Sequence, residues 1–268
     1  KVYFNFGGVM SVLGTVEAYY NSETGLWERD INTNAYSDGS ATMNVTAIDK
    51  YGSETLSETT SFSISNTAPS PYIVTPNDKQ YVTGDMDIIA NTSSNVVSAM
   101  YRIDTNAYQP LTGSLPTWST TYDTRLSTDG AHQLTVWAKN AVGLVGTTEI
   151  TVYMDNTEPT GIINSPLDDE YIQGTYTVRI VAIDAVAVDR VDLNIFNSTV
   201  TIPYNPLTAS YEYTFSAVTK SDGTYNLSAV IYDKVGLSYS TDVTTFNIDN
   251  NPPTLLPGNV KDGTIFSG

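Results

Sequence analysis

The sequence contains no cysteine, a single histidine and no long apolar run. Without cysteine the chain cannot form disulfides, use a thiolate nucleophile or bind zinc or iron–sulfur clusters through sulfur. No apolar segment reaches the roughly 18 residues of a membrane-spanning helix. His132 stands alone, with no sequence pattern around it that would form a Ser-His-Asp triad. These absences exclude thiol chemistry and a membrane span, and we expect no enzyme activity.

Charge is also scarce, and what there is of it is mostly negative. The chain has 12 Lys and Arg against 29 Asp and Glu, which gives a net charge of −17. Charged residues make up 15% of the chain, against about 25% in average globular proteins. Phosphate binding requires clusters of Lys and Arg, so this balance argues against nucleic acid and against anionic membrane surfaces as partners.

The residues that are abundant form an internal repeat. An Asp-Gly turn, an alternating strand, a short glycine turn, a second strand and an Asn/Pro linker recur at 38–69, 129–160 and 222–254. The turn glycines Gly52, Gly143 and Gly236 are 91 and 93 residues apart. A repeat of this length with frequent turns and short strands predicts tandem β-sandwiches.

Apolar residues alternate with polar ones in each copy, as at Leu227, Ala229 and Ile231. This period of two predicts strands with one buried face. We therefore predict an all-β chain of three tandem immunoglobulin-like (Ig-like) sandwiches. The predicted divisions are 1–68 for a first domain that lacks its first strand, 69–157 and 158–250 for two further domains, and 251–268 for a tail.

The third copy carries the pattern D-G-x-Y-x-L-x-A, then D-x-x-G, then D-N-x-x-P. It resembles the Ig-like repeats of bacterial and archaeal surface proteins. The resemblance implies that Tyr225 forms a tyrosine corner, a hydroxyl bond back to the preceding chain. Ala41 and His132 stand at that position in the other copies, and we expect a structural role for His132. Such modules serve adhesins, surface layers, fibres and enzyme spacers, so the resemblance implies fold more than function.

The two ends of the chain complement each other. Residues 253–268 align with 159–174, while KVYFNF at 1–6 reads like YTVRI at 176–180. We therefore expect the tail of one subunit to complete the first domain of the next by strand donation, which generates an open, head-to-tail homopolymer. The alternative is a window of a longer chain whose adjoining domains are covalently continuous. The expected acceptor groove contains Val2, Phe4 and Phe6, and the expected donor residues are Leu255, Leu256, Val260, Ile265 and Phe266.

Two linkers hold oxygen ligands that suit calcium. Asp155 and Asn156 occupy one, and Asp249 and Asn250 the other. They resemble cadherin-type linkers, which implies calcium as a candidate cofactor. The alternative is that these residues form Asx turns and a rigid exit from the last strand. The acidic pair Asp168 and Asp169 lies in a repeated turn, so we read it as scaffold rather than as a glycosidase pair.

The chain also contains N-glycosylation sequons, at Asn44, Asn91, Asn197 and Asn226. N-glycans on these residues would fit a surface protein. We therefore predict an extracellular structural protein: a repeating subunit or segment of a surface filament, sheath or surface layer, assembled by strand donation. The alternative is an Ig-like stalk segment of a larger cell-surface adhesin or surface-layer protein.

Overall fold

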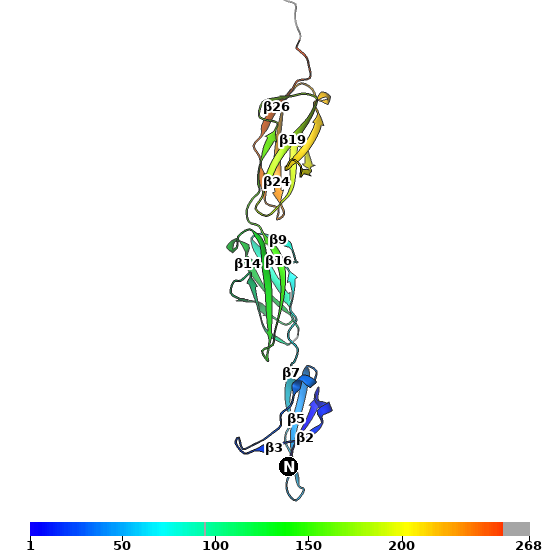
Figure 1. Cartoon of the computed structure of the whole chain (residues 1–268), viewed down its shortest axis with the longest axis vertical. Helices are drawn as coiled ribbons and strands as arrows, with labels where there is room; N and C mark the ends of the chain where they lie inside the picture. Colours follow the sequence, from blue (N-terminus) through cyan, green and yellow to red (C-terminus); the bar gives the residue numbers. More distant parts are fainter. Residues whose placement is uncertain (94, 254–268) are drawn as a thin grey trace, which may run out of the picture. The chain divides into compact units, whose positions relative to one another are not determined.

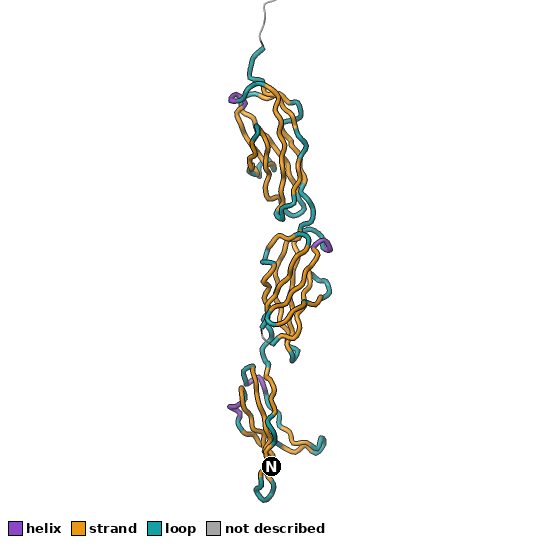
Figure 2. Tube along the Cα trace, turned by 180° about the vertical axis from the view of Figure 1, so that it is seen from behind, coloured by secondary structure: helices purple, strands orange, loops and turns teal. Residues whose placement is uncertain are grey.

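The computed structural model describes residues 1–93 and 95–253. The regular structure of these residues is β-strand, with four short 3₁₀ turns (Figures 1 and 2). The predicted all-β, Ig-like fold class is confirmed. In the described part of the chain, no helix has the length and apolar character needed to cross a membrane.

The third copy of the repeat folds as a two-layer sandwich. Its strands are β17 (Thr160–Ser165), β18 (Glu170–Ile172), β19 (Thr175–Ile183), β20 (Val188–Ile195), β21 (Ser198–Ile202), β22 (Tyr204–Asn205), β23 (Ser210–Ser216), β24 (Gly223–Asp233), β25 (Ser238–Ser240) and β26 (Thr244–Ile248). One sheet has the order β17-β19-β23-β22, and the other has the order β18-β26-β24-β20-β21, with β25 beside β24.

The alternation in the sequence explains the core of this sandwich. Leu227, Ala229 and Ile231 of β24 are at most 2% exposed, as the period of two predicts. They pack in one cluster with Val178 and Phe215 of the facing sheet. The Tyr225 hydroxyl donates to the Ser221 carbonyl oxygen at 2.8 Å, so the predicted tyrosine corner is confirmed.

The second copy has the same plan. Its strands are β8 (Tyr72–Thr75), β9 (Gln80–Val82), β10 (Asp85–Asn91), β11 (Val96–Ile103), β12 (Gln109–Pro110), β13 (Thr112–Ser114), β14 (Thr117–Asp123), β15 (Gly130–Asn140) and β16 (Val145–Met154). They form sheets of order β13-β14-β10-β8 and β12-β11-β15-β16-β9. Leu134, Val136 and Ala138 of β15 are fully buried, like their counterparts on β24.

The first copy is smaller. Its strands are β1 (Val2–Gly8), β2 (Thr15–Glu17), β3 (Tyr19–Asn21), β4 (Leu26–Glu28), β5 (Gly39–Ile48), β6 (Glu54–Leu56) and β7 (Thr60–Ile64). One sheet has the order β2-β1-β5-β6, with β7 also on β5, and β3 and β4 form a separate ribbon. Only Met10, Ala41 and Ile64 form its buried cluster among the described residues, with Phe6 and Phe62 packed against it.

One strand assignment in this copy differs from the sequence prediction. Val2 and Phe4 of β1 pair with Ala47 and Val45 of β5, as Val191 and Leu193 of β20 pair with Ile231 and Ala229 of β24. The segment KVYFNF therefore corresponds to β20, and its expected match with YTVRI of β19 is wrong. In the same way β2 pairs with β1 as β21 pairs with β20. Alternation of apolar residues identifies a strand but not its pairing partner.

The chain divides into two compact units. One comprises residues 1–79, 87–122 and 132–152, and the other comprises 80–86, 123–131 and the residues from Tyr153 onward. Each of the side-chain clusters described below lies within a single unit.

Candidate functional site

The sheet of the first copy has an open apolar face. Val2, Phe4 and Phe6 of β1 lie opposite Ala47, Val45 and Met43 of β5, so they share one face. Val2 is buried, but Phe4, Phe6, Met43 and Val45 are only half-buried and Ala47 is exposed. The positions of β15 and β24 that correspond to Met43, Val45 and Ala47 are at most 2% exposed. This face of the sheet therefore has the apolar side chains of a core, but the described residues cover it only in part.

The ribbon of the first copy shows a matching open edge. Among the described residues, β4 pairs with β3 alone, whereas its counterpart β23 pairs with both β22 and β19. Figures 1 and 2 show the ribbon extending away from β1 and β5. The positions filled by β17, β18 and β19 in the third copy thus have no described strand in the first. The predicted donor residues Leu255, Leu256, Val260, Ile265 and Phe266 lie outside the described residues.

Each copy ends in an asparagine clamp, which has the same bonds in the first and third copies. In the first, the Asn66 backbone N–H donates to Asp38 Oδ1 at 2.5 Å, and its Nδ2 donates to the carbonyl oxygens of Thr33 and Tyr36. In the third, Asn250 makes the same bonds to Asp222, Ala217 and Lys220. The aspartate in each case belongs to the repeated Asp-Gly turn. The linker is thereby tied back to the domain that it leaves.

The second copy has a variant of this clamp. The Asn156 N–H donates to Asp129 Oδ1 at 2.8 Å. Its Oδ1 accepts from Gly84 N at 3.1 Å and from the buried Thr124 hydroxyl at 2.8 Å. The Asn156 amide, an expected calcium ligand, is therefore used within its clamp. Of the Asn250 amide, also an expected ligand, only Nδ2 bonds in the clamp, and Oδ1 is buried without a hydrogen-bond partner. Asp249 Oδ1 accepts from the Asn251 N–H at 3.1 Å.

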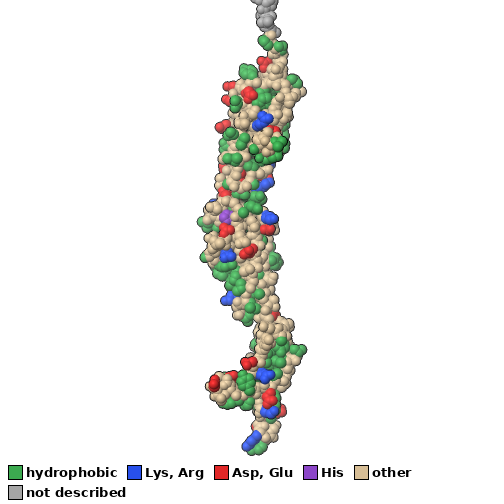
Figure 3. Space-filling view, viewed as in Figure 1, with side chains coloured by type: hydrophobic (Ala, Val, Ile, Leu, Met, Phe, Trp, Pro, Cys, Tyr) green, Lys and Arg blue, Asp and Glu red, His purple; other side chains and the backbone are tan. Residues whose placement is uncertain are grey.

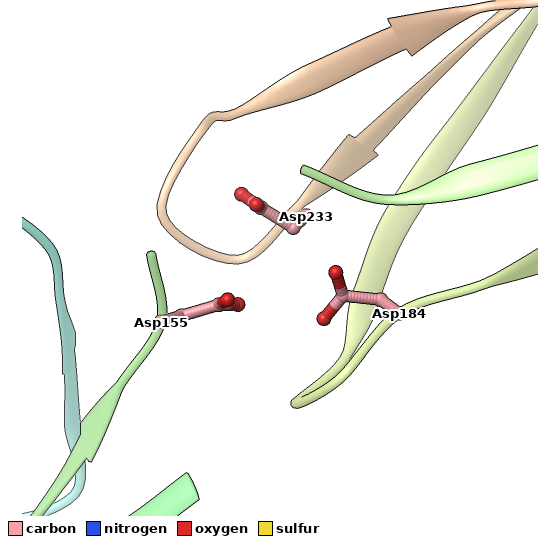
Figure 4. A group of neighbouring side chains, drawn as sticks. All are labelled: Asp155, Asp184 and Asp233. Carbon is pink, nitrogen blue, oxygen red and sulfur yellow. The ribbon is translucent and has the colours of Figure 1, made fainter. Parts of the chain in front are cut away.

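Asp155, the fourth expected calcium ligand, belongs to a cluster of three carboxylates. It follows β16, Asp184 follows β19, and Asp233 ends β24. Figure 4 shows the three carboxylates turned toward one another. One ligand oxygen from each lies within 4.8 Å of the other two. Asp155 is fully buried and Asp233 is 2% exposed.

The hydrogen bonds of the cluster leave specific oxygens free. Asp233 Oδ1 accepts from the N–H groups of Val235, Gly236 and Leu237 at 2.7–2.9 Å. Asp184 Oδ1 accepts two loop N–H bonds in the same way, at 2.7 and 2.8 Å. The Oδ2 atoms of both residues, and both carboxylate oxygens of Asp155, are buried without a hydrogen-bond partner. Four unpartnered oxygens thus share one small region.

Electrostatics reflect this crowding. Burial, followed by the charges of Asp184 and Asp233, raises the pKa of Asp155 to about 6. Burial also raises the pKa of Asp233, although its bonds to Gly236, Leu237 and Val235 oppose the shift. A carboxylate pKa rises when its charged form lacks a counter-charge or a donor.

Sequence reasoning found Asp155 but not its two partners. Asp233 lies in the D-x-x-G turn that defines the repeat, so the sequence marks it only as a feature of the repeat. Asp184 lies in the loop before β20 and has no repeated spacing. One signal in the sequence could have pointed to Asp233. The residue at its turn position varies between copies, being Asp49 in the first and the uncharged Asn140 in the second.

The second copy holds a neutral counterpart of the cluster. Ser65 takes the linker position of Asp155, Asn140 the turn position of Asp233, and Asn95 lies in the loop equivalent to that of Asp184. Asn95 Nδ2 and Asn140 Nδ2 donate to Ser65 Oγ at 3.2 and 3.0 Å. Asn140 Oδ1 accepts from Leu144 N at 2.9 Å, as Asp233 accepts from Leu237 N. Here the side chains satisfy each other directly.

The sequons differ in their surroundings. Asn197 and Asn226 are exposed, and both line a surface depression of about 350 Å³ on the third copy. Asn44 and Asn91 are half-buried. Asn44 Oδ1 accepts from Asn5 Nδ2 at 2.9 Å, and the amide of Asn91 bonds to Tyr72 and Thr117. The first pair is accessible, whereas the second contributes to side-chain networks.

The remaining candidates form hydrogen bonds within their own copies of the repeat. Asp168 Oδ1 accepts from Thr245 N at 2.8 Å, as Asp78 accepts from Thr151 in the second copy. His132 Nδ1 lies 2.7 Å from Asp104 Oδ2. On the face in Figure 3, Lys and Arg side chains are scattered rather than gathered in a patch.

Comparison with known protein families finds matches for the C-terminal part of the chain. Residues 159–229 match the family model for a bacterial Ig domain, and residues 209–268 match that for a bacterial Ig-like domain of group 3. The predicted resemblance to bacterial Ig-like repeats is thus confirmed over residues 159–268. No curated protein sequence matches the chain.

Several solved structures are similar to the chain at low sequence identity and low TM-score. Fibronectin(III)-like modules of Clostridium thermocellum CbhA are 17% identical, covering 68% of this chain and 94% of theirs, with a TM-score of 0.41. A structure from a 1.5-MDa bacterial ice-binding adhesin is 18% identical, covering 93% and 86%, with a TM-score of 0.37. A tetra-tandem repeat from the extending region of a large adhesion protein is 16% identical, covering 92% and 66%, with a TM-score of 0.33.

Proposed function

Residues 159–268 are bacterial Ig-like sequence, and from this premise we propose that the chain is a non-enzymatic, extracellular stalk segment of a cell-surface protein. The observation that supports this most is the repeated asparagine clamp. Asn66, Asn156 and Asn250 each bind the Asp-Gly turn of the copy that they leave. A chain used as a mechanical spacer needs its linkers anchored in this way, so that a pull on the linker is passed to a folded sandwich.

The surface composition fits the same role. Charge is low for the length of the chain and is predominantly acidic, while the uncharged polar residues Thr, Ser, Asn and Tyr are abundant. A net negative charge keeps a protein soluble and disfavours binding to nucleic acid and anionic lipid.

The test of this function is the location of the protein on intact cells. Antibodies raised against residues 1–268 should label unpermeabilised producing cells, and external protease should remove the label. A cytosolic protein measured in parallel controls for lysis. Labelling that appears only after the cells are broken open contradicts the stalk.

The open face and edge of the first copy favour a second function, a filament subunit. In this proposal, the tail at 251–268 of one copy adds strands beside β7, the counterpart of β26, and over Val2, Phe4 and Phe6 of the next. The group 3 match continues through the tail to residue 268, which supports an Ig-like strand identity for it. The tail aligns with 159–174, which contain β17 and β18. It therefore accounts for these two positions, and the β19 position is left for another segment.

Deleting residues 253–268 tests strand donation. The truncated chain should stay monomeric, and a synthetic 253–268 peptide should bind it and raise its melting temperature. A matched peptide with Leu255→Asp and Leu256→Asp should do neither. Polymerisation of the truncated chain contradicts strand donation but leaves the stalk function intact.

For glycosylation we propose attachment at Asn197 and Asn226, whose exposure allows an enzyme to reach the amide. Intact-mass measurement of protein from its own cells should show glycan mass. Substitution of these two residues by Gln should remove it. Full retention of glycan mass in that variant contradicts the assignment.

A further inference from the structure

The three-aspartate cluster is costly unless something binds it. Ionised carboxylates whose oxygens lie within 4.8 Å of one another repel, and they repel more strongly where burial removes the screening by water. No Lys or Arg forms an ion pair with Asp155, Asp184 or Asp233 among the described residues. The unpartnered oxygens of Asp155 are fully buried and face the other two carboxylates (Figure 4).

We propose that Asp155, Asp184 and Asp233 bind one Ca²⁺ ion, and that the Ser65–Asn95–Asn140 cluster is its cation-independent counterpart. Calcium then ties the segment after β16 to two loops of the third copy, while the equivalent segment after β7 needs no ion. This inference does not depend on whether the chain serves as a stalk or as a filament subunit.

The loops hold the ligands ready. Backbone N–H groups fix one oxygen of Asp184 and one of Asp233, which leaves the other oxygen of each residue to point at the ion. Asp155 has both oxygens free. Asp184 and Asp233 therefore offer one oxygen each to an ion, and Asp155 offers two. Calcium takes about 6–8 oxygen ligands, so water or carbonyl groups complete the shell.

The chemistry of the ligands points to calcium, and the distances within the cluster allow it. Two oxygens bound to one Ca²⁺ at about 2.3–2.6 Å are at most about 5 Å apart, which matches the 4.8 Å limit of the cluster. All the side-chain ligand atoms are carboxylate oxygens, which suit hard cations such as calcium. Zinc and copper favour nitrogen and sulfur ligands. Magnesium retains several waters and is held by few carboxylates.

The neutral counterpart supplies an independent argument. At Ser65, Asn95 and Asn140, hydroxyl and amide groups fill the same kind of space and bond to each other. Three carboxylates at equivalent places cannot do this, because ionised carboxylates only accept hydrogen bonds. A bound cation performs at Asp155 the function that two amide donors perform at Ser65.

The counterpart also supplies the test. The variant Asp155→Ser, Asp184→Asn, Asp233→Asn gives the cluster the composition of the neutral one, so it should fold and lose calcium binding. Asp242→Asn, which removes one exposed carboxylate outside the cluster in the same copy, is the control. Calcium is titrated into the chelator-treated full chain by calorimetry, and the melting temperature is followed in parallel.

We expect one Ca²⁺ per wild-type chain, with a Kd of about 10⁻³ M or tighter, the upper limit for extracellular modules. The control should bind equally, and the neutralised variant at least about 100-fold more weakly. Calcium should raise the melting temperature of the wild type and of the control only. Binding of calcium by the neutralised variant with unchanged affinity, or no binding by the wild type at millimolar calcium, overturns the proposal.

Discussion

Asn140 Nδ2 donates to Ser65 Oγ at 3.0 Å, in the position where Asp233 and Asp155 face each other without a hydrogen bond. The two pairs hold the same turn and linker positions in successive copies of the repeat. The hydrogen bond between Asn140 and Ser65 satisfies the first pair, whereas Asp233 and Asp155 need a cation between them. The repeat thus builds two kinds of junction from a single backbone plan.

The asparagine clamp should be measurable at a single amide. Replacing Asn156 with Ala removes the acceptor of the Gly84 N–H, which costs about 1–3 kcal/mol when such a group is buried. Hydrogen exchange at Gly84 should become about 5- to 100-fold faster. Asn251→Ala, which leaves Asn156 untouched, is the control. Unchanged exchange at Gly84 would show that the clamp does not stabilise this part of the structure.

The tyrosine corner should stabilise the third copy. Tyr225→Phe keeps the ring that packs on Phe196 and Phe246 and removes only the bond to Ser221. The expected loss is about 1 kcal/mol, seen as about fivefold faster hydrogen exchange of the buried β24 amides. Tyr204→Phe, on an exposed ring, should leave exchange unchanged. Equal effects of both substitutions would rule out a specific corner.

Acid should loosen the clamp of the first copy. The backbone N–H of Asn66 holds the pKa of Asp38 below its ordinary value of 3.8. Because the folded pKa is the lower one, the stabilising effect is present above about pH 4 and is lost as pH falls through the folded pKa. Amide exchange at Asn66, corrected for its intrinsic pH dependence, should therefore lose protection in acid. In Asp38→Asn this loss should disappear; a loss of equal size there contradicts the assignment.

Chelation should act on one copy only. Adding EDTA to the calcium-loaded chain should reduce amide protection in the loops that carry Asp184 and Asp233. The loops that carry Asn95 and Asn140 should be unaffected, because their bonds to Ser65 involve no ion. Equal loss of protection in both places would contradict a single, localised site.

The sequence predicted what depends on local pattern. Alternation gave the strands around Leu227, and the Asp-Gly turn gave the repeat and the corner at Tyr225. The sequence pattern assigned β1 to the wrong strand of the sandwich. Apolar and polar residues alternate in the same way in β19 and β20, which differ in whether they pair with β23 or β24. The pattern found Asp155 in a linker but missed Asp184, since three loops distant in sequence meet only after folding.

The most direct test of the two-junction account is the reciprocal substitution Ser65→Asp, Asn95→Asp, Asn140→Asp in the full chain. Calcium stoichiometry by calorimetry should be two ions for this variant, one for the wild type and none for Asp155→Ser, Asp184→Asn, Asp233→Asn. A variant that folds but still binds one ion, or a neutralised chain that still binds one, would contradict the claim that these three positions decide between a calcium junction and a hydrogen-bonded one.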